Sequence, residues 1–185
     1  MAAPMLPQTS LDAPFSAHYV QARQEIEYLR RWYCRATDLF GMTGNGAATD
    51  EARRIYRRIF TADANIRVSG ATGRPLQARG PDGWAAVVTE ALRDYTVTQH
   101  LLGTQLVDFR VLTPEEDEGG SYRLRAGEAC LSSYLQAWHV WPDNRLRVVM
   151  GNYLDEVRYV PGTGWQIHDM NLVHLTSEVR PLGSV

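Results

Sequence analysis

Three polar side chains interrupt otherwise apolar rows of a predicted sheet, and they are the first candidates for chemistry. Ser133 and His139 lie in the row of alternate residues over 131–141, and Asn152 lies in the row over 146–154. A strand buried on one face should carry apolar side chains there. A sheet curled around a cavity would point these groups at a ligand, whereas a closed core would hydrogen-bond each internally. We predict all three as substrate-binding residues, with internal hydrogen bonding as the alternative.

A histidine, an aspartate and a tyrosine could supply acid–base chemistry. His100 lies on the same side of a β-rich segment as Thr98 and Leu102. Asp38 comes near the end of a predicted helix, where the negative end of the helix dipole disfavours a carboxylate. Tyr33 is on the apolar stripe of that helix, about 140° around the axis from Asp38, so helical geometry alone does not pair the two. Ordinary core packing is the alternative for Tyr33, and an exposed helix end is the alternative for Asp38.

The elements that must position these residues follow from the spacing of apolar side chains. Apolar residues three and four apart over 16–40 predict a long amphipathic helix. A second helix is predicted to start at a Thr49 cap and to run through Phe60, and a third to begin at Pro81. A small hairpin ending near Arg79 is expected between them. Four later β-rich segments, 97–112, 122–141, 146–160 and 165–175, predict an antiparallel meander. Helices followed by a curled sheet define an α+β fold with the helices on one face.

Length and composition favour one globular domain. The 185 residues are 44% hydrophobic and 22% charged, with a formal charge of −2. This charge gives no electrostatic case for nucleic acid or an anionic membrane. Residues 1–14 are proline-rich and predict a flexible arm, which leaves 15–185 as a single domain. Cys34 and Cys130 lie in apolar segments and are expected to be buried free thiols, which favours a cytoplasmic protein.

Metal and phosphate chemistry find little support in the motifs. His168, Asp169 and His174 are the richest cluster of metal-ligating residue types, but their spacing matches no standard ligand set. A glycine-rich turn from a strand to a helix, which phosphate binding would need, is missing from the sequence. We therefore expect no cofactor and no metal, and a metal hydrolase remains the weaker alternative.

Five short motifs recur in an order and spacing that resemble a known family. They are Glu25-Ile-x-x-Leu29, Tyr33-Cys-Arg-Ala-Thr-Asp38, Thr98-Gln-His100, Gly151-Asn-Tyr-x-Asp155 and Gly164-Trp-Gln-Ile167. Together, over about residues 16–175, they resemble the SnoaL-like branch of the NTF2-like superfamily, near the bile-acid dehydratase and scytalone dehydratase type. The glycine loop after Phe40 and the acidic hairpin near 114–120 look longer than in a minimal member, so the shape of the pocket can differ.

The resemblance implies both a shape and a site. The shape is a cone of about three N-terminal helices on a curled, mostly antiparallel sheet, which encloses a pocket. In the dehydratase relatives, a tyrosine and an aspartate from the first helix meet a histidine from the sheet. The matching positions here are Tyr33, Asp38 and His100. The resemblance also implies a small hydrophobic substrate that is steroid-, terpenoid- or polyketide-like, and a homo-oligomer, either a dimer or a trimer.

The leading hypothesis is a cofactor-independent dehydratase or isomerase. His100 would act as general base and then acid, because imidazole titrates nearest to neutral pH. Asp38 would orient His100, and Tyr33 would donate a hydrogen bond to the oxyanion that forms on the substrate. A polyketide-type cyclase could use the same base. A non-catalytic small-molecule-binding protein of the same fold is the alternative from another class.

Overall fold

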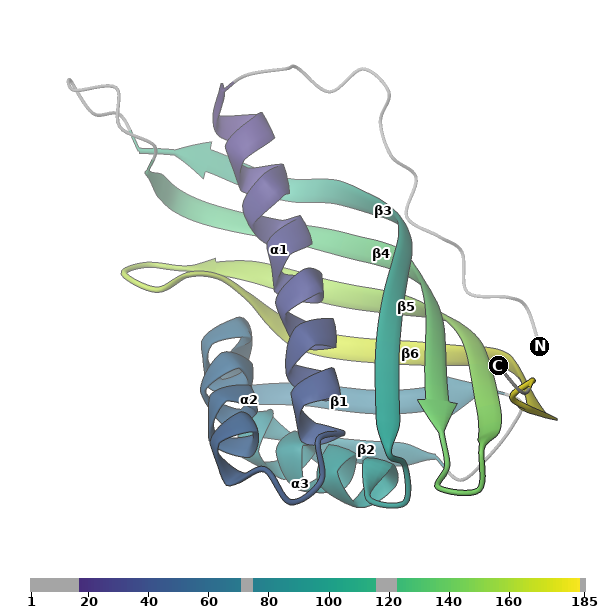
Figure 1. The fold of residues 1–185 in the computed structure, drawn as a ribbon. Coiled ribbons are helices and arrows are strands. Elements are labelled where there is room, and N and C mark those ends of the chain that lie inside the picture. The colour runs from purple at the N-terminus through teal and green to yellow at the C-terminus, as the bar shows by residue number, and fades with distance from the viewer. Residues whose placement is uncertain (1–16, 71–74, 116–122, 184–185) are drawn as a thin grey trace.

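The computed structural model describes residues 17–70, 75–115 and 123–183. Three helices pack on one face of a curled, open, mixed sheet of six strands (Figure 1). The predicted α+β class with about three helices is therefore confirmed. The predicted arm over 1–14 and most of the acidic hairpin tip lie outside the described residues. In the described part of the chain, no helix is both long and apolar enough to cross a membrane.

The three helices form where the apolar periodicity predicts them, with one corrected start. They are α1 (Ala17–Phe40), α2 (Gly46–Ile59) and α3 (Gly80–Leu92). The predicted Thr49 cap of the second helix is wrong, because Asn45 caps α2 by accepting a 3.1 Å hydrogen bond from the backbone N–H of Ala48. Asparagine caps at least as well as threonine and comes earlier in the chain, so the helix begins one turn sooner.

The sheet orders its strands β2-β1-β6-β5-β4-β3. Their bounds are β1 (Phe60–Gly70), β2 (Leu76–Arg79), β3 (Val97–Pro114), β4 (Leu124–Val140), β5 (Arg145–Val160) and β6 (Gly164–Pro181). The four long strands β3 to β6 form the predicted antiparallel meander, and β1 and β2 form the predicted hairpin. β1 runs parallel to β6. Phe60, which was predicted within the second helix, is instead the first residue of β1.

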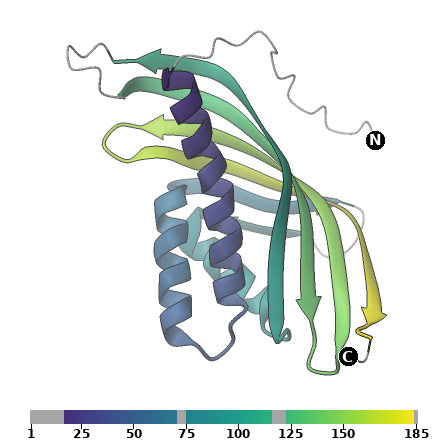
Figure 2. The same cartoon turned by 45° about the horizontal axis from the view of Figure 1, so that its top comes forward.

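Irregular pairing bends the long strands around α1. The register shifts between Leu102 and Gln105 in β3 and between Met150 and Gly151 in β5. An extra residue in one strand bends it and increases its twist. Figure 2 shows β3, β4 and β5 curving past the helices, so that the sheet has a concave inner face toward α1 and a convex outer face. The three predicted catalytic residues, Tyr33, Asp38 and His100, lie between α1 and the inner face of the sheet, together with the core.

Both cysteines are buried and neither forms a disulfide, as predicted. Burial raises the pKa of the Cys34 thiol to about 12, and burial together with Glu156 raises that of Cys130 to about 11. A thiol reacts as the thiolate. Neither cysteine is therefore activated as a nucleophile.

Candidate active site

His100 of β3 and Asp38 of α1 form a hydrogen-bonded pair. The Nδ1 atom of His100 lies 2.7 Å from Oδ1 of Asp38. The backbone N–H of His100 donates to Oδ2 at 3.2 Å, and the hydroxyl of Thr98 donates to Oδ1 at 3.3 Å. A carboxylate that accepts these bonds holds Nδ1 as the protonated nitrogen of the neutral ring. The Nε2 atom of His100 is then left with a free lone pair.

A close approach between the end of α1 and β3 makes this pair possible. A Cβ atom on Gly41, the first residue after α1, would lie 2.2 Å from Oγ1 of Thr98. A larger residue at position 41 would push the strand away from the helix end. The glycine therefore lets Thr98 and His100 reach Asp38, which lies in the last turn of α1.

The pair is largely withdrawn from solvent. The side chain of His100 is 7% exposed and that of Asp38 is 23% exposed. Charge interactions are stronger in such a site than in water. If Nε2 of His100 takes a proton, the Asp38 carboxylate stabilises the resulting imidazolium. The arrangement is therefore suited to a general base that becomes a general acid.

His139 extends the pair along the inner face of β4. Its ring is perpendicular to that of His100, with the centroids 5.5 Å apart, and it packs 4.8 Å from the ring of Tyr95. Burial, with a smaller contribution from His100, lowers the pKa of His139 to about 3. Its buried Nδ1 has no hydrogen-bond partner among the described residues. His139 is thus a neutral imidazole beside His100, with one buried nitrogen that has no partner among the described residues.

The lowered pKa of His139 predicts acid sensitivity. Because the pKa falls from 6.5 to about 3 on folding, the unfolded chain binds this proton more readily. This contribution to stability is complete above about pH 6.5 and is lost as the pH falls toward about 3. We expect His139→Gln to reduce the loss between about pH 7 and about pH 5, by up to about 1.4 kcal/mol per pH unit. Urea unfolding at both pH values measures the free energy of unfolding of each protein. Equal losses of stability in the wild type and in His139→Gln would contradict the prediction.

The other two predicted substrate-binding residues lie on opposite faces of the sheet. Ser133 pairs with Tyr153 and faces the helices, and its buried hydroxyl has no partner among the described residues. Asn152 pairs with Tyr134, the neighbour of Ser133, and therefore lies on the outer face. The structure does not bring Asn152 together with His139 or His100. Both rows of β5 are rich in apolar residues, so alternation could not decide which one faces inward.

Tyr33 lies in an aromatic cluster rather than against the pair. Its hydroxyl accepts a 3.2 Å hydrogen bond from the indole N–H of Trp84, and its ring stacks on Tyr56 with a 5.4 Å centroid distance. Burial raises the pKa of Tyr33, which keeps the phenol protonated. Within the described residues, no hydrogen bond joins Tyr33 to Asp38 or His100. The structure therefore unites two of the three predicted catalytic residues and places the third deeper in the core.

A buried ion pair beneath this cluster escaped the sequence analysis. The side chains of Arg30 and Asp155 are both 0% exposed, and Nε of Arg30 donates to Oδ2 of Asp155 at 3.1 Å. The guanidinium carbon lies 3.8 Å from the ring centroid of Tyr153 and 4.5 Å from that of Tyr33. Two signals were available: Arg30 interrupts the apolar stripe of α1, and Asp155 belongs to one of the short motifs.

The geometry does not support the metal-hydrolase alternative. Across 17–70, 75–115 and 123–183, no group of three or more His, Cys, Asp or Glu side chains could hold a metal ion. His174 is buried and His168 half-buried on β6. Those two histidines and Asp169 are therefore read as parts of the sheet.

Comparisons with known proteins agree with this architecture. Residues 18–171 match the SnoaL-like domain. A type 2 hexachlorocyclohexane dehydrochlorinase (LinA) superposes with a TM-score of 0.63 at 13% identity, covering 91% of this chain and 93% of that one. A Novosphingobium aromaticivorans protein assigned as a scytalone dehydratase gives 0.61 at 18% identity, covering 91% and 97%. An NTF2-like superfamily protein from Salmonella enterica gives 0.59 at 14%, covering 85% and 94%. No curated protein matches the chain.

Proposed function

The chain belongs to the SnoaL-like domain family, and from this premise we propose that it is a cofactor-independent lyase or isomerase that removes a proton from carbon. The observation that carries the proposal is the 2.7 Å contact between Nδ1 of His100 and Asp38 on the inner face of the sheet. Structural neighbours of the dehydratase and dehydrochlorinase kind support the same class of chemistry, although the fold also serves proteins without catalysis.

The proposed reaction begins at Nε2 of His100. This nitrogen takes a proton from a carbon next to a substrate carbonyl, and the electrons of the C–H bond move onto the carbonyl oxygen. Asp38 stabilises the imidazolium that forms. In a dehydration, the proton then passes to a hydroxyl on the neighbouring carbon, which leaves as water as the double bond forms. In an isomerisation, the proton on Nε2 exchanges with solvent, a proton is then delivered from Nε2 to a different carbon, and nothing leaves.

Two further groups are proposed to hold the substrate. His139 offers its unpartnered Nδ1 to a polar group of the ligand. Tyr33, whose hydroxyl accepts from Trp84, is proposed to turn its own O–H toward a carbonyl oxygen that reaches the aromatic cluster. The surrounding side chains, among them Tyr95 and Leu135, are apolar. These surroundings favour a hydrophobic polycyclic hydroxy ketone of the steroid, terpenoid or polyketide class.

The test is a mass-spectrometric assay in D₂O with a panel of such hydroxy ketones. A lyase gives a product lighter by one water, and an isomerase gives deuterium uptake without loss of mass. Either result should disappear in His100→Ala and persist in His168→Ala, a control histidine on β6. A cyclised product, in place of water loss or deuterium uptake, would favour the polyketide-type cyclase. Binding without any chemistry in the wild type would favour a small-molecule-binding protein and sink the catalytic proposal.

We also propose that a second copy of the chain covers the outer face of the sheet. A hollow of about 620 Å³ there is lined by ten residues, none of them an acidic or basic side chain, and includes Tyr134, which is 50% exposed. The Arg110–Glu156 ion pair lies on the same face, at a distance along the strands. An apolar and amide centre with charges beyond it is the usual composition of a homodimer interface. Light scattering should find a dimer that Tyr134→Arg converts to monomer, whereas a monomeric wild type would contradict this.

A further inference from the structure

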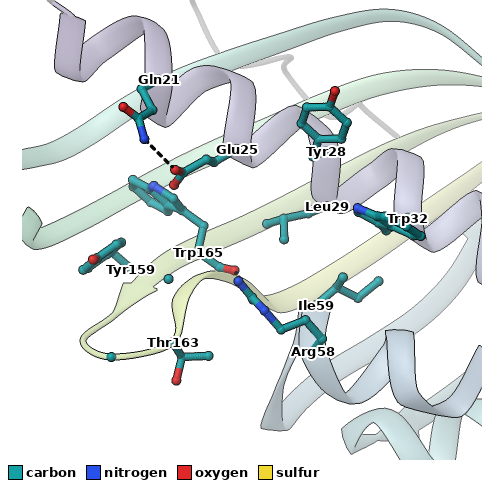
Figure 3. Close-up of a pocket in the computed structure, with 12 residues that line it drawn as sticks. Gln21, Glu25, Tyr28, Leu29, Trp32, Arg58, Ile59, Tyr159, Thr163 and Trp165 are labelled. Carbon is teal, nitrogen blue, oxygen red and sulfur yellow. Dashed lines mark hydrogen bonds between the residues drawn. The ribbon is translucent and has the colours of Figure 1, made fainter. Parts of the chain in front are cut away.

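A second cleft lies beside α1, away from β3 and His100, and it has the features of a ligand site. It has a volume of about 620 Å³ and lies between α1, the end of α2 and the turn that joins β5 to β6 (Figure 3). His100, Asp38 and His139 do not line it. An inference about this cleft therefore goes beyond the proposed reaction and does not depend on it.

The wall formed by α1 is aromatic where a solvated helix face should be polar. Tyr28 is 45% exposed and Trp32 is 48% exposed, and both line the cleft. The floor is formed by the buried side chains of Leu29, Ile59 and Trp165. Figure 3 shows Tyr28 and Trp32 along the helix, with Trp165 beneath it. Exposed aromatic side chains beside a buried apolar floor offer stacking surfaces to a flat ring.

A guanidinium group enters the cleft from the end of α2. Nη1 of Arg58 makes one 3.4 Å contact, with the backbone oxygen of Trp165. Gly164, with a φ of +98°, brings the turn against this group, since a Cβ there would lie 3.3 Å from Nη2 of Arg58. No described carboxylate forms an ion pair with Arg58, whereas Arg57 next to it pairs with Asp82 at 2.9 Å. Arg58 therefore keeps most of its five donors for another acceptor.

The negative group of the cleft is better satisfied. Oε1 of Glu25 accepts a 3.1 Å hydrogen bond from the side-chain amide of Gln21, and Glu25 is half-buried. A second oxygen remains to accept a bond from a hydroxyl or amide donor. Neither charge of the cleft has an ion-pair partner among the described residues, but Arg58 keeps more unused hydrogen-bonding positions than Glu25, which favours a ligand with an anionic group.

We propose that this cleft binds a flat aromatic molecule that carries a carboxylate. The carboxylate pairs with Arg58, whose planar fork matches it in geometry. The ring lies against Trp32 and Tyr28, and a hydroxyl on the ring donates to Glu25. Two features indicate this class of ligand: the guanidinium of Arg58 has no ion-pair partner among the described residues, and the exposed rings of Tyr28 and Trp32 lie over an apolar floor.

The test uses 4-hydroxycinnamate as the probe and 4-hydroxycinnamyl alcohol as its neutral analogue, with affinities from isothermal titration of the full chain. We expect the acid to bind about tenfold or more tightly than the alcohol, and Arg58→Gln to remove this difference. Trp32→Ala should weaken both probes. The matched controls are Arg57→Gln and Trp138→Ala, which alter an arginine and an exposed tryptophan outside the cleft and should bind like the wild type.

Two results would overturn the proposal. One is an absence of binding by the acid at millimolar concentration. The other is binding that Arg58→Gln and Trp32→Ala both leave unchanged. Because the substituted side chains are exposed, circular dichroism of each variant should match the wild type, and the two substitutions act on different parts of the ligand. Loss of binding in His100→Ala as well would place the probe at the catalytic pair instead and would also count against the cleft.

Discussion

Replacing His100 by alanine is expected to lower turnover by about 10²–10⁴-fold, the usual contribution of a positioned general base. The variant removes the only group of the pair with a free lone pair directed away from Asp38. Substrate binding should change far less than turnover, because the apolar surroundings supply most of the affinity. Single-turnover kinetics on whichever hydroxy ketone reacts in D₂O, together with equilibrium binding, would separate the two effects.

Asp38→Asn provides the companion measurement. An amide can donate as well as accept, so the His100 ring is no longer held in the tautomer with a free Nε2. We expect a loss of turnover that approaches that of His100→Ala, and a double variant that is little worse than either single one, because the two residues act as a unit. Independent, multiplicative losses would show that Asp38 does not act through His100.

Breaking the buried pair is expected to have the largest effect on stability. Arg30→Met leaves Asp155 as an uncompensated charge in a site with 0% exposure, and such losses are about 3–5 kcal/mol. Replacing both partners, in Arg30→Met with Asp155→Leu, removes the unpaired charge and should return much of the lost stability. The free energy of unfolding from urea titration measures both effects.

A surface pair supplies the control for this experiment. Arg67 and Asp169 lie 2.7 Å apart but remain partly exposed, so Arg67→Met should cost less than about 1 kcal/mol. If Arg30→Met proved equally mild, the core would be admitting water to Asp155. If the double variant were the least stable of the three, the contacts of the guanidinium with the rings of Tyr33 and Tyr153 would outweigh the desolvation of the charges.

Much of the fold could be predicted because its periodicities are strong. The stripe over 16–40 identifies α1, and four β-rich segments separated by turn residues identify the meander. The pairing of β1 with β6 could not be predicted, because β1 and β6 lie far apart in the sequence and no local pattern encodes their contact. The cap of α2 was missed because Asn45 lies within the glycine loop after Phe40, whereas Thr49 comes after that loop.

The site was predictable where motif and geometry agree. Asp38 and His100 lie 62 residues apart, and helical geometry says nothing about their contact; the family resemblance placed them together and the structure does so too. The face of Asn152 could not be predicted, because the outer face of this sheet is also apolar. The partner of Arg30 could not be predicted either, since a charge on an apolar stripe reveals that a partner exists without identifying it.

The central claim is that Asp38 holds His100 with Nδ1 protonated and Nε2 free to take a proton. Nitrogen-detected NMR of the histidine side chains reports this directly, without a substrate, at a pH where imidazole is neutral. The account predicts that Nε2 of His100 has the chemical shift of an unprotonated nitrogen in the wild type, and that Asp38→Asn shifts the tautomer population. A proton found on Nε2 of His100 in the wild type would contradict it.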